Sequence, residues 1–499
     1  MSDTRPTNPV IPGFHPDPSI CRVGDDYYLV CSSFEYFPGI PVFHSRDLAH
    51  WTQIGNALDR ASQLELPADT PSSAGIYAPT LRHHDGRFWL IVTNVREGAG
   101  NIVVSATDPA GPWSDPVRLP GVPGIDPDLA WDEDGTCWCT VAGVAQVRID
   151  LETGETLGPP EKLWSGAPGA KAPEAPHLYR IGEYWYLLIA VGGTERGHGV
   201  AIARSNAPSG PFEPCPANPI LTHRGTDHPV QNTGHADLVQ APDGSWWMVM
   251  LGVRPGGGTP GWHVLGRETF LAPVTWVDDW PVVGEVTLEL PKFPWPLAPG
   301  PVEEQRDDFE LSELRPSWIS LRDRPAEHVT TRERPGWLTL RARGGSLDEA
   351  DVIFTGRRQQ HLACRARTLI DPSQGCGGLA VRLDERHHYA VEADGTEVRV
   401  IARIGTLRTV VAAEPLPEGP VVLGVTIADP PPPHDARTGP DAVSLGFERP
   451  DGTFTTLATL DGRYLSTEVA GGFTGRVIGM YAATGTAHFD WFDYEPNGR

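Results

Sequence analysis

A short segment recurs five times in the N-terminal part of this chain, and it constrains the fold more than any other feature. Each copy combines a short strand, a turn built on Gly or Asp, and a second strand rich in aromatic and β-branched residues. The copies begin at Asp17, Ala78, Asp126, Glu174 and His235. Hairpin units that recur about every 50 to 60 residues are typical of a β-propeller, in which each unit forms one blade. The sequence therefore predicts five blades whose first strands line a central channel.

The repeat directs three carboxyl groups and a histidine toward one small volume. Alignment on the Leu or Ile three positions after the start gives one column with Asp17, Ala78, Asp126, Ala175 and His235. Glu174 lies one position earlier, which we interpret as a bend at the blade end that aims the longer Glu side chain differently. A single Asp-Pro pair is explained equally well by turn preference. Three carboxyl groups at or beside one register favour a shared site.

Composition narrows the classes of partner. The chain of 499 residues has a formal net charge of −24, which argues against nucleic acid and an anionic membrane as partners. The segment from Met1 to Pro12 is polar and Pro-rich, and we find neither a signal peptide nor a stretch of about 20 apolar residues. Seven cysteines without CxxC spacing are typical of free thiols in a reducing compartment. The predicted location is cytoplasmic.

A proline-rich segment marks the clearest domain boundary. Five prolines between Leu290 and Pro301 predict a stiff, extended connector. Alternating runs that begin at Trp337 and Glu397 predict short strands without a repeat, as in an antiparallel sandwich. The predicted fold class is therefore all-β, a five-bladed β-propeller followed by a jelly-roll-like β-sandwich. The predicted boundaries are propeller 1–295, linker 296–306 and sandwich 307–499.

Long motifs resemble glycoside hydrolase family 43 over nearly the whole chain. Asn8-Pro-Val-Ile-Pro-Gly-Phe-His-Pro-Asp, Ser32-Ser-Phe-Glu-Tyr-Phe-Pro-Gly and Gly75-Ile-Tyr-Ala-Pro-Thr resemble that family's propeller motifs. Further matches are Gly234-His-Ala-Asp-Leu-Val and Leu265-Gly-Arg-Glu-Thr-Phe, and, in the second domain, Phe354-Thr-Gly-Arg-Arg-Gln-Gln-His and Gly471-Gly-Phe-Thr-Gly. The last two are similar to the sandwich appended to the family's β-xylosidases. The resemblance implies a propeller plus a sandwich, and exo-hydrolysis of plant-wall pentosides.

Three carboxyl groups suit the hydrolysis of a glycoside. One carboxylic acid protonates the leaving oxygen, and in an inverting enzyme a carboxylate on the other face activates water. A third acid near the general acid holds up the pKa of that acid by like-charge repulsion. Matched motif to motif, the resemblance implies Asp17 as general base, Glu174 as general acid and Asp126 as the modulator that tunes and orients Glu174. Enzymes of this family invert, so we expect no covalent intermediate.

The resemblance also implies substrate-binding residues. Arg267 would contact the base carboxylate and sugar hydroxyls, lowering the pKa of the base. Phe34 and Tyr77 resemble pocket-wall aromatics, although many β-xylosidases of the family carry Trp in place of Tyr77. Phe473, in a loop flanked by glycines, would lean over the propeller mouth and make the sandwich close the pocket. The alternative is that Phe473 packs in the core of the sandwich itself.

His235 is the histidine of the repeat column and would also face the channel. There it would order a central water or lie behind the ligands of a bound cation, and the alternative is a structural histidine. The resemblance allows calcium near His235, but the sequence has no Asp-x-Asp-x-Asp loop of the calcium-binding type. We assign no metal ligand, and the chemistry requires no cofactor.

The sequence thus predicts an exo-acting inverting glycoside hydrolase that releases D-xylose from the non-reducing ends of short β-1,4-xylooligosaccharides, in xylan degradation. One alternative is an α-L-arabinofuranosidase or a bifunctional enzyme, because xylopyranose and arabinofuranose present similar hydroxyl arrangements. Another is a non-catalytic carbohydrate-binding protein, since propellers and sandwiches also serve as lectins. A lectin, however, has no use for a desolvated acid with a raised pKa. The resemblance also favours a homo-oligomer.

Overall fold

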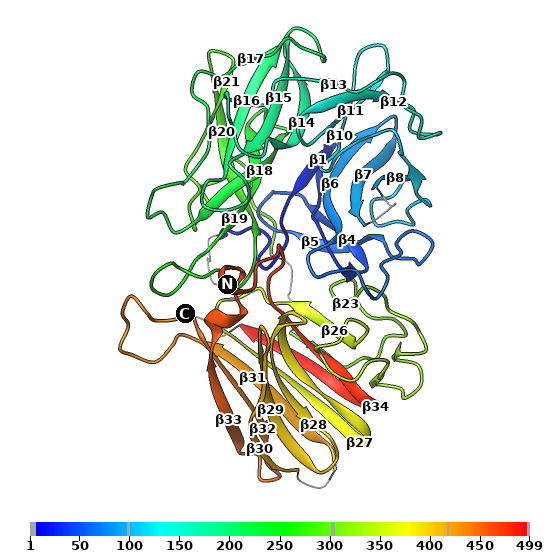
Figure 1. Cartoon of the computed structure of the whole chain (residues 1–499). Helices are drawn as coiled ribbons and strands as arrows, with labels where there is room; N and C mark the ends of the chain where they lie inside the picture. Colours follow the sequence, from blue (N-terminus) through cyan, green and yellow to red (C-terminus); the bar gives the residue numbers. More distant parts are fainter. Residues whose placement is uncertain (1–5, 97–99, 301–304, 417–418, 497–499) are drawn as a thin grey trace.

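The protein folds into two β domains, which Figure 1 shows as a propeller and a sandwich in contact. The computed structural model describes residues 6–96, 100–300, 305–416 and 419–496. Within these ranges the helical elements are the short 3-10 turn η1 (Gly462–Leu465) and the helix α1 (Thr467–Ala470). Neither has the length and apolar character needed to cross a membrane. The predicted all-β fold class, a five-bladed propeller with a sandwich, is confirmed.

Each blade of the propeller is a four-stranded antiparallel sheet, and the blades follow chain order. Blade I contains β1 (Ser19–Val23), β2 (Asp26–Val30), β4 (Gly39–Ser45) and β5 (Thr52–Leu58). Blade II contains β6 (Gly75–His84), β7 (Arg87–Val95), β8 (Gly100–Ala106) and β9 (Val117–Arg118). Blade III contains β10 (Asp128–Trp131), β11 (Cys137–Val141), β12 (Ala145–Ile149) and β13 (Glu161–Lys162). Blade IV contains β14 (Glu174–Ile181), β15 (Tyr184–Val191), β16 (Gly199–Ser205) and β17 (Glu213–Pro214). Blade V contains β18 (Gln231–Gln240), β19 (Trp246–Val253), β20 (Glu268–Val277) and β21 (Trp280–Val283).

The first strand of each blade lies nearest the propeller centre, as the repeat predicts (Figure 1). Apolar clusters of buried side chains fill the space between every pair of neighbouring blades. The ring is closed by the N-terminal segment: Ile11 forms a β-bridge with Thr269, and the Asn8 side chain exchanges hydrogen bonds of 2.9 and 3.0 Å with the Leu271 backbone. Because each blade packs against the next, the five inner strands are held in fixed positions relative to one another.

The sandwich contains the remaining strands around one large apolar core. Its first strands are β22 (Arg306–Asp307), β23 (Ile319–Leu321), β24 (Val329–Thr330), β25 (Leu338–Arg341) and β26 (Ile353–Arg358). The following strands are β27 (Cys364–Asp384), β28 (His387–Ala393), β29 (Glu397–Ile404), β30 (Leu407–Pro415), β31 (Val421–Ala428), β32 (Ala442–Glu448), β33 (Phe454–Asp461) and β34 (Val477–Pro496). The long strands β27 and β34 pair with each other over most of their length. They link all strands of this domain into one hydrogen-bonded system.

The two domains share backbone hydrogen bonds and a core. Strand β3 (Tyr36–Phe37), which leaves blade I, pairs with β23 of the sandwich. Aromatic side chains of the propeller pack there against aliphatic and aromatic side chains of the sandwich in a separate cluster, in which Phe34 is buried and Phe473 half-buried. This shared core fixes the sandwich against the mouth of the propeller.

The proline-rich segment is packed rather than free-standing. Phe293 stacks on Trp247 of blade V with ring centroids 4.8 Å apart. The Ala298 backbone N–H donates to the Asp47 carboxylate at 2.9 Å. The last propeller strand ends at Val283 and the first sandwich strand begins at Arg306. Residues 284–300 therefore belong to the connection between the two domains, and the contacts of Phe293 and Ala298 hold it against the propeller.

Candidate active site

Backbone conformation explains how the repeat delivers its side chains to the channel. Four residues of the repeat column have a left-handed backbone, with φ of 57° at Asp17, 53° at Asp126, 49° at Ala175 and 45° at His235. In a regular strand only alternate residues face one side, and a bulge re-aims the residues beside it. In β14 the pairing shifts between Glu174 and His177. The bend expected at Glu174 is therefore a β-bulge.

Asp17 is a buried carboxylate that accepts bonds from several donors. Its Oδ1 accepts a 3.0 Å bond from Arg267 and lies 3.5 Å from His235 Nδ1, and its Oδ2 accepts a 2.5 Å bond from Ser32. Burial alone would raise the pKa of Asp17, but Arg267, His235 and Ser32 outweigh burial and hold that pKa below its ordinary value. Asp17 is thus kept ionised.

Glu174 and Asp126 show the opposite shift. Burial, followed by repulsion from Asp17, raises the pKa of Glu174 to about 7. Burial, followed by repulsion from Glu174, raises the pKa of Asp126 well above its ordinary value. The Asp126 carboxylate also accepts a 3.2 Å bond from the backbone N–H of Ala175. The charge of Glu174 therefore helps to raise the pKa of Asp126, whereas the raised pKa of Glu174 itself comes from burial and from Asp17.

Three aromatic rings and one arginine line the site beside these acids. Phe34 stacks on Phe473 at 6.1 Å between centroids, and Tyr77 contacts both rings edge-on at 5.7 and 5.9 Å. The Arg267 guanidinium lies 5.2 Å from the Phe473 ring centroid and 5.8 Å from that of Phe34. Phe473 comes from the sandwich, whereas the other residues come from the propeller. The structure places it against the propeller aromatics and not in the core of its own domain.

The loop that carries Phe473 docks on one propeller residue. The Phe473 backbone N–H donates to Ser73 Oγ at 2.8 Å. Gly472 has a φ of 81°, and a Cβ on it would lie 2.5 Å from the same hydroxyl oxygen. Glycine is therefore required at this position by both conformation and space. The contact fixes the sandwich loop at the edge of the site.

A cavity of 420 Å³ adjoins this wall. Its lining includes Arg267, Asn232 and Phe473 together with Glu195 and Thr467. Thr467 belongs to the sandwich, so both domains contribute to the cavity. The Arg267 guanidinium connects it to Asp17. The cavity thus reaches Arg267, the hydrogen-bond partner of Asp17, whereas the three carboxyl groups themselves are not among its described lining residues.

His235 lies within a group of buried histidines. Burial lowers the pKa of His235 to about 3 and that of His198 to about 4, so both are neutral near pH 7. The His198 Nε2 atom lies 3.9 Å from Glu174 Oε1. No group of three His, Cys, Asp or Glu side chains that could hold a metal ion occurs in the described part of the chain. A calcium ion near His235 stays a prediction.

All eight site residues expected from the sequence are thus brought into one region, and the structure adds others. Thr194 Oγ1 accepts a 3.0 Å bond from Arg267, Ser32 donates to Asp17, and His198 Nε2 lies 3.9 Å from Glu174 Oε1. Ser32 opens a motif of the resemblance and could have been found from the sequence. His198 could not, because it lies outside the repeat in an ordinary Gly-His-Gly stretch.

An ion network that was not predicted from the sequence connects the inner strands at the propeller centre. We call the following residues the central network: Ser19, Arg82, Asp128, His177 and Asp237. Each comes from the first strand of a different blade. Arg82 bridges Asp128 at 2.8 Å and Asp237 at 2.9 Å, Ser19 donates to Asp237 at 2.9 Å, and His177 Nδ1 lies 3.0 Å from Asp128. The network therefore connects all five blades at the axis.

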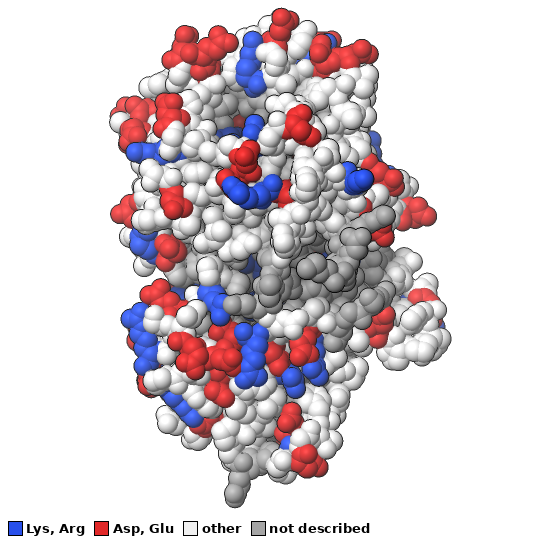
Figure 2. Space-filling view, turned by 180° about the vertical axis from the view of Figure 1, so that it is seen from behind, with Lys and Arg blue, Asp and Glu red and all other residues white. Residues whose placement is uncertain are grey.

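Charged side chains outside the site are distributed over both domains. On the face drawn in Figure 2, acidic and basic side chains are interspersed over the propeller and the sandwich.

All seven cysteines are free and buried.

Comparisons with known proteins agree with the geometry. Residues 6–281 match the family described as Glycosyl hydrolases family 43, and residues 306–495 match the Beta xylosidase C-terminal Concanavalin A-like domain. A non-reducing end alpha-L-arabinofuranosidase of Bacteroides ovatus is 41% identical over 518 residues, covering 98% of this chain and 94% of that protein. A xylosidase/arabinosidase of Butyrivibrio fibrisolvens is 38% identical over 528 residues, covering 98% of each.

A solved structure supports the same assignment. The xylan beta-1,4-xylosidase from Bacillus halodurans C-125 superposes with a TM-score of 0.89 at 32% identity, covering 98% of this chain and 100% of that chain. Both the fold and the sequence are therefore shared along the whole length. The chain belongs to glycosyl hydrolase family 43 and is a glycoside hydrolase of the xylosidase/arabinofuranosidase group.

Proposed function

We propose that this enzyme is an exo-acting, inverting hydrolase that releases D-xylose from the non-reducing ends of short β-1,4-xylooligosaccharides. The observation that carries the proposal is the pair of opposite pKa shifts in two largely buried carboxyl groups, the first of which is bound by Arg267 at the edge of the cavity. Asp17 is held ionised while the pKa of Glu174 is raised to about 7. Two acids with opposed environments are the requirement for a base and an acid that work at the same pH.

The mechanism follows from these environments. Asp17 accepts a proton from a water molecule as that water attacks the anomeric carbon, and Glu174 donates its proton to the leaving oxygen. Arg267 and Ser32 hold the Asp17 carboxylate in place through hydrogen bonds of 3.0 and 2.5 Å. Water attack opposite to the leaving group inverts the anomeric configuration in a single step. Asp126 modulates the acid through the repulsion between the two carboxyl groups, which is among the causes of the raised pKa of Asp126.

The sandwich supports exo action. Phe473 reaches from the sandwich onto Phe34 and Tyr77, so the site is walled on that side. A walled pocket accepts a chain end and excludes the middle of a polymer. Aromatic rings also provide apolar surfaces for the faces of a sugar ring.

A second candidate is α-L-arabinofuranosidase activity, alone or beside xylosidase activity. Two observations favour it: the relative from Bacteroides ovatus is named an arabinofuranosidase, and the pocket wall carries Tyr77. Hydrolysis of 4-nitrophenyl β-D-xylopyranoside and 4-nitrophenyl α-L-arabinofuranoside distinguishes the candidates. The proposal expects a higher kcat/KM on the xyloside. A higher kcat/KM on the arabinofuranoside would select the second candidate, and activity on neither would reject both.

A further inference from the structure

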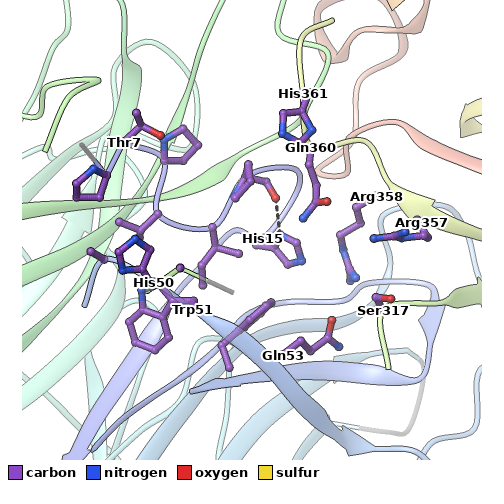
Figure 3. A pocket seen from close by; sticks show the side chains of 18 residues that line it. Thr7, His15, His50, Trp51, Gln53, Ser317, Arg357, Arg358, Gln360 and His361 are labelled. Atoms are coloured by element: carbon purple, nitrogen blue, oxygen red, sulfur yellow. Dashed lines mark hydrogen bonds between the residues drawn. The ribbon is translucent and has the colours of Figure 1, made fainter. Parts of the chain in front are cut away.

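A second cavity lies between the propeller and the sandwich, separate from the catalytic pocket. Its volume is 560 Å³, and residues of the N-terminal segment, blade I and the end of β26 line it (Figure 3). Among the described lining residues, every ionisable side chain is Arg or His, and Asp and Glu are not represented. This composition is unexpected in a chain with a net charge of −24. The cavity thus has the electrostatic character of an anion site.

Arg358 is the central feature of this cavity. Its side chain is buried with 5% exposure, and its buried Nε and Nη2 atoms have no hydrogen-bond partner among the residues that the structure describes. Burial lowers the pKa of Arg358 to about 10, and the neighbours that oppose this effect are the Cys31 thiol and the Tyr36 phenol rather than a carboxylate. The guanidinium also lies 4.5 Å from the Phe14 ring centroid. No described carboxylate pairs with this guanidinium; burial without a counter-ion is costly, and an anionic ligand would reduce that cost.

His15 lies beside Arg358 and complements it (Figure 3). Its Nδ1 is 3.0 Å from the Pro12 carbonyl, so Nδ1 carries the proton and donates. Burial, reinforced by Arg358, lowers the pKa of His15 well below its ordinary value, so the ring is neutral. The remaining nitrogen, Nε2, is therefore an acceptor. An arginine donor next to a neutral histidine acceptor suits a molecule with both a carboxylate and hydroxyl groups.

The rest of the lining fits a sugar. Gln53, Gln360 and Ser317 contribute amide and hydroxyl groups, and Trp51 and Phe43 contribute apolar surface. Polar groups that fix hydroxyls, combined with aromatic surface, are typical of carbohydrate pockets. The volume is within the range of small-molecule sites and exceeds the need of a single inorganic ion.

We propose that this cavity binds a monosaccharide-sized sugar acid, with its carboxylate on Arg358 and its hydroxyls on His15, Gln53 and Gln360. Part of the lining comes from residues 357–361, which belong to a motif of the second domain that the catalytic mechanism does not use. It adjoins the catalytic residues through the backbone, because the His15 N–H donates to the Arg267 carbonyl at 3.1 Å. The proposal does not depend on whether the catalytic pocket prefers xylose or arabinose.

Isothermal titration calorimetry of the full chain with D-glucuronate, D-xylose and inorganic phosphate tests the proposal. We expect D-glucuronate to bind in a manner that Arg358→Gln weakens at least tenfold. Gln360→Glu places a carboxylate in the cavity at nearly constant volume and should weaken binding similarly, even if the Arg358 variant folds poorly. Arg437→Gln is the matched control, because it removes the same charge from a side chain that is 90% exposed.

The three ligands separate the sources of affinity. D-Xylose lacks the carboxylate, so its binding should not change in either cavity variant. Phosphate lacks the sugar frame and should bind at least tenfold more weakly than D-glucuronate. The proposal is overturned if D-glucuronate does not bind, if phosphate binds as tightly, or if the Kd for D-glucuronate is the same in wild type, Arg358→Gln and Gln360→Glu.

Discussion

Asp17 and Glu174 are carboxyl groups whose surroundings move their pKa values in opposite directions. Arg267, His235 and Ser32 stabilise the anion of Asp17, whereas Glu174 is half-buried and faces the charge of Asp17. Each residue type is ordinary, and the difference comes from the neighbours that the propeller brings together. Position in the repeat was enough to select both acids from the sequence, but their protonation states required the structure.

The first prediction concerns the pH dependence of the wild-type enzyme. Glu174 has to be protonated to act as an acid, so kcat/KM should fall as pH rises through the pKa of the acid pair, near or above the value of about 7 for Glu174. Asp17 has to be ionised, and its lowered pKa should keep kcat/KM high until the pH falls below the ordinary range for Asp. A pH profile of kcat/KM on a nitrophenyl glycoside measures both limbs. An alkaline limb near the ordinary pKa of Glu would contradict the assignment.

The second prediction concerns Asp126. Replacement by Asn keeps an acceptor for the Ala175 N–H but removes the carboxyl group whose charge interacts with that of Glu174. The last proton should then leave at lower pH, so the alkaline limb of kcat/KM should move to lower pH and the rate should fall. A pH profile of Asp126→Asn beside wild type checks this. An unchanged limb with a small loss of rate would make Asp126 a turn former only.

At the scale of elements, the loop at Gly471–Gly475 is the part of the sandwich that contacts the aromatic residues of the candidate active site. Its glycines let the backbone approach Ser73, and its Phe473 ring completes the aromatic wall. The glycine-flanked Phe was visible in the sequence, but its partners were not, because Ser73 and Phe473 are 400 residues apart.

The third prediction concerns this loop. Phe473→Ala should raise KM and lower kcat/KM with little change in Tm, because it removes a pocket wall and little core packing. Phe454→Ala is the matched control, since Phe454 lies on β33 of the same domain with 38% exposure. Phe489→Ala, in the sandwich core, should instead cost about 3–5 kcal/mol of stability. A loss of Tm in Phe473→Ala like that of Phe489→Ala, with unchanged kinetics, would assign Phe473 to structure alone.

Sequence periodicity predicted the blades because each unit is local, a hairpin with its own turn. The bend at Glu174 was predicted from a one-residue offset, and the structure explains it by a bulge. The pairing of β3 with β23 was missed, since two-residue strands in different domains leave no local pattern. The extent of β27 and β34 was missed for a similar reason, because their length reflects pairing with each other.

At the scale of the molecule, the central network holds the five blades in the arrangement that the site requires. Its arginine, Arg82, follows a Leu and precedes two His, a context that resembles an exposed strand. Its partners Asp128 and Asp237 belong to two other blades, so the ion pairs form only when the ring of blades is closed. Both acids lie two positions after a residue of the repeat column, and this regularity is the one sequence signal that could have identified them.

The fourth prediction tests the central network. Arg82→Met leaves two buried carboxylates without their cation, and loss of one partner from a buried pair costs about 3–5 kcal/mol. The variant should have a clearly lower Tm by calorimetry. Arg180→Met is the control, because Arg180 is an exposed arginine on β14 and should change Tm little. Equal Tm values for the two variants would show that the network does not hold the propeller together.

The central claim is that Glu174 acts as the general acid and Asp17 as the general base. The dependence of kcat/KM on the leaving group tests this claim most directly. Glu174→Ala should reduce kcat/KM on xylobiose far more than on a 4-nitrophenyl glycoside, whose leaving group needs little protonation. Asp17→Ala should reduce both alike, because both require an activated water. Equal losses on the two substrates in Glu174→Ala would contradict its role as the acid.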